Sequence, residues 1–261
     1  GLTGIHGVST PWKNLVVNTE VSDKPGGAGG SFGIGKNAAF ACSQLRLVMY
    51  STRNIEGEEA TQGTLLLPSY QKGNEKFDGS GFVCLSSEDI NIDPLLKSVS
   101  MDEGYERSET GLDKYILGFD EEKTAEELKM AVIKSAIENF LYAFYQNTLE
   151  VRYDDIIINQ ENLADFIEKY GEKLEDITKE QYMTLTKPDK VENFSIFEEN
   201  DVTYFIRLDP EATKKAAVVR RSGMKVFDRS YRTGRIGFSA VIVLNNPKIN
   251  EFFKSLENPE H

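Results

Sequence analysis

The first part of the chain alternates short apolar stretches with polar turns that contain glycine, a pattern that is typical of β-strands. A run of small residues before these stretches predicts a short helix at residues 36–43. We expect the strands at residues 44–51, 61–68, 81–86 and 114–119. Residues 1–30 are rich in Gly, Ser and Thr, and we expect them to form loops without regular structure.

The pattern changes near residue 120, where the longest helical signal begins and runs over residues 121–147. Its apolar positions recur three and four residues apart and form one wide stripe, which consists of Met130, Ile133, Ile137, Phe140, Leu141 and Phe144. Thr124 and Glu127 have the spacing of a capping box. After this helix we expect a strand at 149–158, a helix at 162–174, strands at 193–198, 202–209, 216–220, 225–227 and 238–244, and a last helix at 247–256.

This order of elements predicts an α/β protein of the α+β type with antiparallel or mixed sheets. A length of 261 residues allows one or two domains. The change of pattern places the division at residue 120, so that residues 1–119 form one domain and residues 120–261 the other.

Composition and charge exclude several functional classes. The two histidines, His6 and His261, lie near the two ends, which removes most metallohydrolase and Ser-His-Asp mechanisms. The net charge of −12 opposes nucleic-acid binding by the whole surface. No apolar run approaches the roughly 18 residues of a membrane helix. Cys42 and Cys84 both stand in apolar segments, and we expect buried, reduced thiols in a cytoplasmic protein.

The most specific segment is GGAGGSFGIGKNAAF at residues 26–40, where six glycines run directly into the first predicted helix. Glycine lets backbone N–H groups approach a ligand closely, and a helix N-terminus presents unpaired N–H donors at the positive end of its dipole. The segment therefore predicts a phosphate-binding loop. The alternative is a turn that only connects to a helix.

Two well-known phosphate loops fit this segment incompletely. Gly30 to Lys36 match the start of the P-loop pattern G-x-x-x-x-G-K-[ST], but Asn37 stands where the Mg²⁺-binding hydroxyl belongs. No buried strand precedes the loop, as a P-loop or a dinucleotide fingerprint requires. A P-loop nucleotidase therefore ranks third, after the two functions given at the end of this section.

The string GSFGIGKNAAF resembles the second glycine box of the GHKL ATPases, the class that includes gyrase, a heat-shock chaperone, histidine kinases and MutL. The resemblance implies that residues 9–30 form an ATP lid. It also implies that ATP contacts the following residues of the box: Gly30, Ser31, Phe32, Gly33, Ile34, Gly35 and Lys36. A later G-T pair of this class corresponds here to Gly111 and Leu112, so Gly111 is a further expected contact. Leu112 replaces the threonine that helps to hold adenine through water, and Thr110 is the nearest hydroxyl in the sequence.

More broadly, the chain is similar to an uncharacterised prokaryotic group of GHKL proteins. The matching strings lie at residues 31–43, 116–119, 219–224 and 257–261. The resemblance implies a partial Bergerat-type ATPase sandwich over residues 1–119 and a transducer-like α/β domain over residues 120–261. It also implies ATP and Mg²⁺ as cofactors, a cytoplasmic location and dimerisation with a second copy.

The family's catalytic Glu, Mg²⁺-binding Asn and adenine-reading Asp all precede the lid. Fewer than thirty residues precede the glycine box here, and none of them has the pattern E-x-x-x-N on a helical segment. We therefore expect these residues before Gly1, and we assign neither the catalytic base nor a metal ligand within residues 1–261.

Residues 214–235 form a basic strip in this acidic protein. It contains eight basic residues and one acidic residue, Asp228; the basic residues are Lys214, Lys215, Arg220, Arg221, Lys225, Arg229, Arg232 and Arg235. In two-domain GHKL ATPases a basic residue of the transducer domain reaches the γ-phosphate, and Arg220, Arg221 and Lys225 are the candidates. The alternatives are a solvated strand edge, or contact with nucleic acid or an acidic partner.

Two functions from different classes follow from these features. The first is an ATP-binding and ATP-hydrolysing conformational switch, of which this chain lacks the catalytic base. The second is a non-enzymatic interaction module that uses a degenerate GHKL scaffold and the basic strip as its contact surface.

Trp12, the single tryptophan, is expected to anchor the lid or the core.

Overall fold

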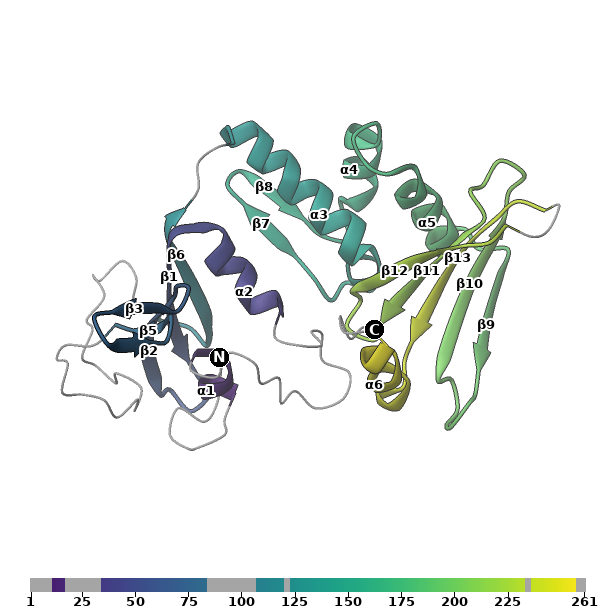
Figure 1. The fold of residues 1–261 in the computed structure, drawn as a ribbon. Helices are drawn as coiled ribbons and strands as arrows, with labels where there is room; N and C mark the ends of the chain where they lie inside the picture. Colours follow the sequence, from purple (N-terminus) through teal and green to yellow (C-terminus); the bar gives the residue numbers. More distant parts are fainter. Residues whose placement is uncertain (1–10, 17–33, 84–106, 120–122, 233–235, 257–261) are drawn as a thin grey trace. The chain divides into compact units, whose positions relative to one another are not determined.

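The computed structural model describes residues 11–16, 34–83, 107–119, 123–232 and 236–256 (Figure 1). The chain divides into two compact units, of which the first ends at Glu122 and the second continues from Lys123. Helices occur together with antiparallel sheets and one mixed sheet, so the predicted α+β class is confirmed. No helix in the described ranges is long and apolar enough to cross a membrane.

The first unit is built on a four-stranded antiparallel sheet. Its strand order is β5-β2-β1-β6, with β1 at Ser43–Arg53, β2 at Glu59–Leu66, β5 at Ser80–Phe82 and β6 at Gly111–Phe119. A separate hairpin joins β3 (Tyr70–Lys72) to β4 (Glu75–Phe77). The helices are α1 (Pro11–Val16) and α2 (Ile34–Ala41).

Helix α1 corrects the expectation that residues 1–30 contain no regular structure. Pro11 occupies the first helical position, where its missing N–H costs nothing. Trp12 and Val16, one helical turn apart, bury their side chains against Val48 and Tyr50 of β1. Tertiary packing therefore forms this helix in a segment whose composition favours loops.

The second unit contains a five-stranded mixed sheet of order β12-β11-β13-β10-β9. Its strands are β9 (Lys190–Phe194), β10 (Val202–Leu208), β11 (Lys215–Arg220), β12 (Lys225–Ser230) and β13 (Phe238–Leu244). The pair β11–β13 is parallel, and the other pairs of this sheet are antiparallel. The helices are α3 (Ala125–Tyr145), α4 (Leu163–Tyr170), α5 (Asp176–Thr186) and α6 (Pro247–Leu256).

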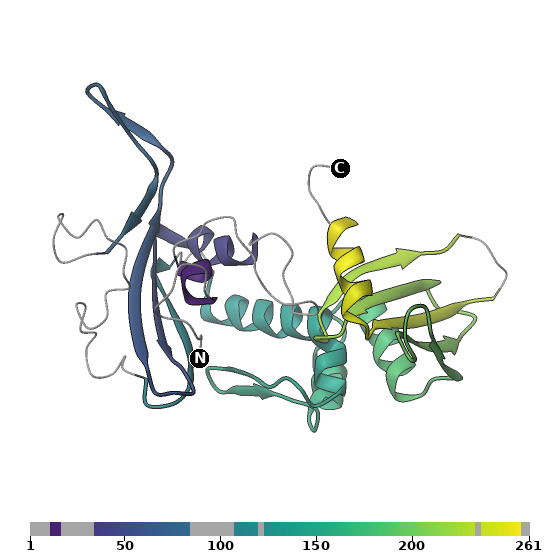
Figure 2. The same ribbon diagram turned by 90° about the horizontal axis from the view of Figure 1, so that it is seen from below.

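Helices cover both faces of this sheet (Figures 1 and 2). Val219 and Val241 face the core with α3, whereas Val218 and Leu244, on the opposite side of the same strands, pack with Ile249 of α6. The predicted apolar stripe of α3 is buried in the larger of these cores, and the capping box of Thr124 and Glu127 is confirmed.

Four other features of the chain differ from the expectations. Residues 149–158 form a hairpin of β7 (Val151–Tyr153) and β8 (Ile156–Ile158), because the chain turns at Asp154 with a positive φ of 51°. Helix α5 was not expected, and β9 begins three residues before the expected strand at 193–198.

Cys42 is exposed, because α2 ends at Ala41 and buries Phe40, not the cysteine, against the sheet. Cys84 lies outside the described residues.

Candidate functional site

The glycine box ends inside a helix. Gly30, Ser31, Phe32 and Gly33 lie outside the described residues, and so does most of the expected lid. Ile34, Gly35 and Lys36 form the first turn of α2, so the helix begins two residues earlier than expected. The first N–H groups of a helix have no partner within it. The predicted phosphate contacts at these three residues are therefore backbone groups at a helix N-terminus.

The other end of α2 is fixed to the sheet of the first unit. The ring of Phe40 is buried against Val48 and Tyr50 of β1. The Arg46 guanidinium donates a hydrogen bond to the Phe40 carbonyl at 3.1 Å, and Arg46 has a positive φ of 53° at the irregular start of β1. Phe40, at position seven of an eight-residue helix, thus holds α2 on one face of the sheet.

The face under α2 also carries Leu112, the residue that follows Gly111. Leu112 pairs with Thr52 of β1, and its side chain packs against the core cluster that contains Phe40. The structure therefore brings α2 and the Gly111–Leu112 segment to one face of one sheet.

Thr52 is a neighbour of the predicted contact Gly111 that the sequence pattern did not reveal. It lies directly across from Leu112, it is buried, and its hydroxyl donates to the Gly111 carbonyl at 3.0 Å. The register of β1 against β6 would have identified this neighbour, but a sequence pattern does not give the register.

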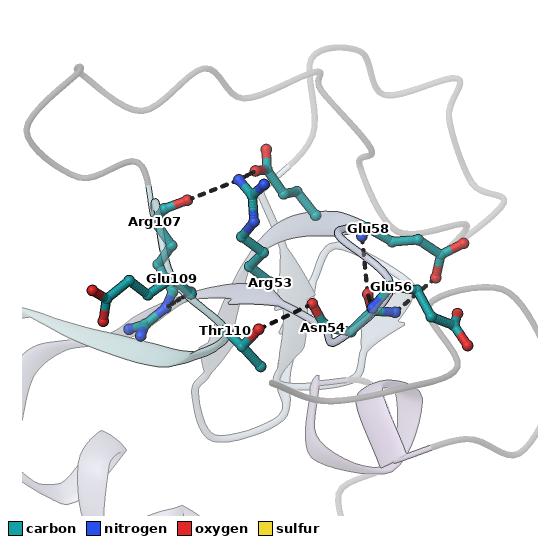
Figure 3. A network of polar contacts seen from close by, with 8 residues as sticks. Arg53, Asn54, Glu56, Glu58, Arg107, Glu109 and Thr110 are labelled. Carbon is teal, nitrogen blue, oxygen red and sulfur yellow. Dashed lines mark hydrogen bonds and ion pairs between the residues drawn. The ribbon is translucent and has the colours of Figure 1, made fainter.

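Thr110, the nearest hydroxyl in the sequence, is directed elsewhere (Figure 3). Its hydroxyl donates to the carbonyl of Asn54 at 3.4 Å, in the turn between β1 and β2. The side-chain oxygen of Asn54 accepts the N–H groups of Glu56 and Glu58, both at 2.9 Å, and its amide donates to the Glu58 carboxylate. Thr110 therefore joins the strands at this turn.

Gly111 is enclosed by an arginine. A Cβ at this position would lie 2.0 Å from Nη2 of Arg107, whose guanidinium binds the Asp113 carboxylate. The same guanidinium donates to the Glu109 carbonyl (Figure 3). Arg53, the strand partner of Gly111, forms an ion pair with Glu59 and donates to the Arg107 carbonyl. Glycine at 111 therefore leaves space for this network of polar contacts, which lies at one end of the sheet.

The three transducer candidates belong to the second unit, at the hairpin between β11 and β12. Arg220 ends β11 and is only 5% exposed, whereas Arg221 is exposed in the turn. Lys225 begins β12, and its ammonium lies 2.9 Å from the Asp228 carboxylate, which also accepts the Gln181 amide at 2.6 Å.

The basic strip is not one continuous solvent-facing surface. Of its described residues, Arg221, Arg229 and Arg232 are exposed, and the Arg229 guanidinium lies over the Tyr231 ring at 5.9 Å. Arg235 lies outside the described residues. The charge count of the strip therefore overstates the positive charge that a partner would meet.

A buried carboxylate fixes the loop after β9. Asp201 is 2% exposed and accepts the N–H groups of Ile196, Phe197 and Glu198 on one oxygen, and the Asn246 amide on the other. Burial opposes ionisation, but these hydrogen bonds outweigh it and lower the pKa of Asp201 from 3.8 to about 2.

This pKa predicts an acid-dependent part of the stability. Because the folded-state pKa lies below the unfolded value, the contribution is present above pH 4 and is lost as the pH falls from about 4 to about 2. Asp201→Asn should melt at a lower temperature than the wild type at pH 6, and this difference should shrink towards pH 2. Thermal unfolding followed by circular dichroism between pH 2 and pH 6 measures it. Asp165→Asn, at an exposed position of α4, is the control, and equal pH profiles for the wild type and Asp201→Asn would contradict the assignment.

The described residues hold no group of three or more His, Cys, Asp or Glu side chains that is placed to bind a metal ion. No model of a protein family matches the chain, and no curated protein matches it either.

Proposed function

We propose that the chain binds ATP as part of a nucleotide-driven conformational switch of the GHKL class. The observation that carries the proposal is the position of α2. This helix begins within the glycine box and is packed by Phe40 onto the sheet face that carries Leu112. In this proposal the phosphates bind at the start of the helix and the base lies over the sheet.

Backbone N–H groups supply most of the phosphate contact in this proposal. We expect the groups from Phe32 to Lys36 to contact the anion, the helix dipole to add partial positive charge, and the Lys36 ammonium to add an auxiliary charge. Mg²⁺ would accompany the phosphates. The described residues contain no cluster of side chains that could bind it. No catalytic base is assigned either, so the proposal for this chain concerns binding. A cytoplasmic location and closure with a second copy are part of the same proposal.

The glycine box should respond more strongly to glycine replacement than to loss of its lysine. We expect ATP to bind the wild type weakly, with a Kd of roughly 1 mM, about −4 kcal/mol, because the adenine-reading Asp is not among these residues. Gly33→Val or Gly35→Val should weaken binding by at least about tenfold, since a side chain there blocks the approach of phosphate. Lys36→Ala should cost about two- to fivefold, because in this proposal the lysine adds one auxiliary charge to the backbone contacts. Titration calorimetry with Mg-ATP measures all three.

Lys72→Ala, at an exposed position of β3, controls for a general change of charge. Circular dichroism of each variant shows whether it is folded. A larger loss from Lys36→Ala than from the glycine variants would favour a P-loop, whose lysine contacts the transferred phosphate directly. Tight, adenine-selective binding by the 261-residue chain would contradict the present assignment.

The second candidate function is a non-enzymatic contact with nucleic acid or an acidic partner. The exposure of Arg221, Arg229 and Arg232 beside Tyr231 supports it. A single-stranded oligonucleotide that binds with a steep salt dependence, while ATP does not bind, would favour this function over the switch.

A further inference from the structure

The hydroxyl of Tyr50 is buried and has no hydrogen-bond partner. Tyr50 lies within β1, its residue is 0% exposed, and burial raises the pKa of the phenol to about 12. Four buried side-chain atoms without a partner occur in the described ranges, and that of Tyr50 is the one in the first unit. Buried hydroxyls are nearly always bonded, because an unpaired one loses its hydration without compensation.

Polar groups near Tyr50 bond to the backbone instead. The hydroxyl of Thr64 donates to the Val16 carbonyl at 3.0 Å, and the Gln62 amide, directly across from Tyr50, donates to the carbonyls of Gly63 and Val83. Lys114, the strand partner of Tyr50 on β6, is exposed, and the neighbours in the core cluster are apolar or aromatic: Trp12, Phe40, Val48, Ala60 and Leu112. Such a mostly apolar lining suits a flat, neutral heterocycle with a polar edge better than a phosphate.

Helix α1 packs over this position. It has six residues, too few to be stable alone, and it is held by the packing of Trp12, Leu15 and Val16, by the hydrogen bond from Thr64 and by further polar contacts of Lys13 and Asn14. This helix could leave the sheet without breaking a strand pair, but the Trp12 indole would then lose its buried contacts. The free energy needed to move the helix would reduce the net free energy of ligand binding, which agrees with the weak affinity expected for ATP.

We propose that the Tyr50 hydroxyl is a hydrogen-bonding group for the base of the bound nucleotide and is reached when α1 leaves the sheet. This inference rests on the proposed function, since it takes the phosphates of the same ligand to lie at the start of α2. The phenol stays protonated at neutral pH, so it donates to a ring nitrogen or a carbonyl of the base.

Tyr50→Phe tests the role of the hydroxyl because it removes one oxygen and keeps the ring. Binding of ATP and of adenosine should weaken about three- to tenfold, the range for one lost neutral hydrogen bond. Binding of tripolyphosphate should not change. The melting temperature of Tyr50→Phe should equal or exceed that of the wild type, because the wild-type hydroxyl makes no hydrogen bond that the variant would lose. A hydroxyl with a structural role would give the opposite result, a lower melting temperature and unchanged adenosine binding.

Tyr115→Phe is the matched control. Tyr115 lies on β6 of the same sheet, pairs with Met49, and thus belongs to the other face; its hydroxyl donates to Asp113 at 3.4 Å. Its replacement should leave adenosine binding unchanged. An equal loss from both tyrosine variants would overturn the inference, because it would indicate a general effect on the sheet.

Trp12 provides an independent optical measurement, since it is the only tryptophan and packs in the same cluster as Tyr50. Saturating adenosine should shift its emission to longer wavelength and increase quenching by acrylamide, whereas tripolyphosphate should not. Bound adenosine with unchanged emission would overturn the inference.

The two proposals fail in different ways. If tripolyphosphate binds and the glycine-box variants abolish this binding, but adenosine does not bind, the inference about Tyr50 fails and the phosphate site stands. If neither ATP nor tripolyphosphate binds the wild type, the proposed function fails and the inference fails with it.

Discussion

Trp12→Ala is expected to lower the free energy of unfolding of the first unit by about 3–5 kcal/mol, the usual cost of removing a large buried aromatic side chain. The indole is 1% exposed and belongs to a cluster with five other buried residues. A domain has only about 5–15 kcal/mol of net stability, so this loss would leave the unit close to its unfolding transition. Helix α1 should detach more readily as well, because its largest buried side chain would be gone.

Hydrogen exchange of the β1 and β2 amides measures this effect, since the variant has no tryptophan fluorescence. Trp12→Phe, which keeps an aromatic ring, should lose clearly less protection. Amides of α3 belong to the other compact unit and should exchange as in the wild type. Unchanged exchange in β1 of Trp12→Ala would show that the indole does not support the core.

Trp12 also illustrates which parts of the fold a sequence can predict. The long helix α3 was predicted because a repeated apolar stripe and the Thr124–Glu127 capping box are local signals. Helix α1 has six residues in a segment rich in loop-forming residues, and only its contacts with β1 and β2 make it a helix. Helix α5 was missed for a related reason, because it buries Thr178, Gln181 and Thr184, which an apolar pattern does not count.

The candidate site shows the same limit. The glycine box and its helix were predicted from composition, and α2 begins within the box. Thr52 and Tyr50 were not found, because their relation to Leu112 and to α2 depends on strand register and on a buried atom without a partner. Arg220 was counted as part of a charged strip, yet β11 is a central strand with helices on both faces, which buries its residues regardless of type.

The turn between β11 and β12 gives the other large expected effect. Gly223 has a positive φ of 84°, and a Cβ there would lie 2.5 Å from the Cβ of Ala143 and 2.7 Å from its Cα. The positive φ costs an L-residue about 1–2 kcal/mol, and the overlap with the α3 backbone adds about 1–3 kcal/mol because a packed helix yields little. Gly223→Ala should therefore destabilise the second unit by about 3 kcal/mol.

Gly57→Ala separates the two causes. Gly57 has nearly the same φ, 83°, but a Cβ there would meet nothing within 4 Å, so only the backbone cost of about 1 kcal/mol should remain. Urea unfolding gives both values, with Trp12 emission reporting on Gly57→Ala in the first unit and exchange of the α3 amides reporting on Gly223→Ala in the second. Equal losses at the two positions would mean that α3 moves aside freely. A larger loss at Gly223 would mean that the hairpin carrying Arg220, Arg221 and Lys225 is held rigidly against α3, because the glycine allows the closest approach of the two elements.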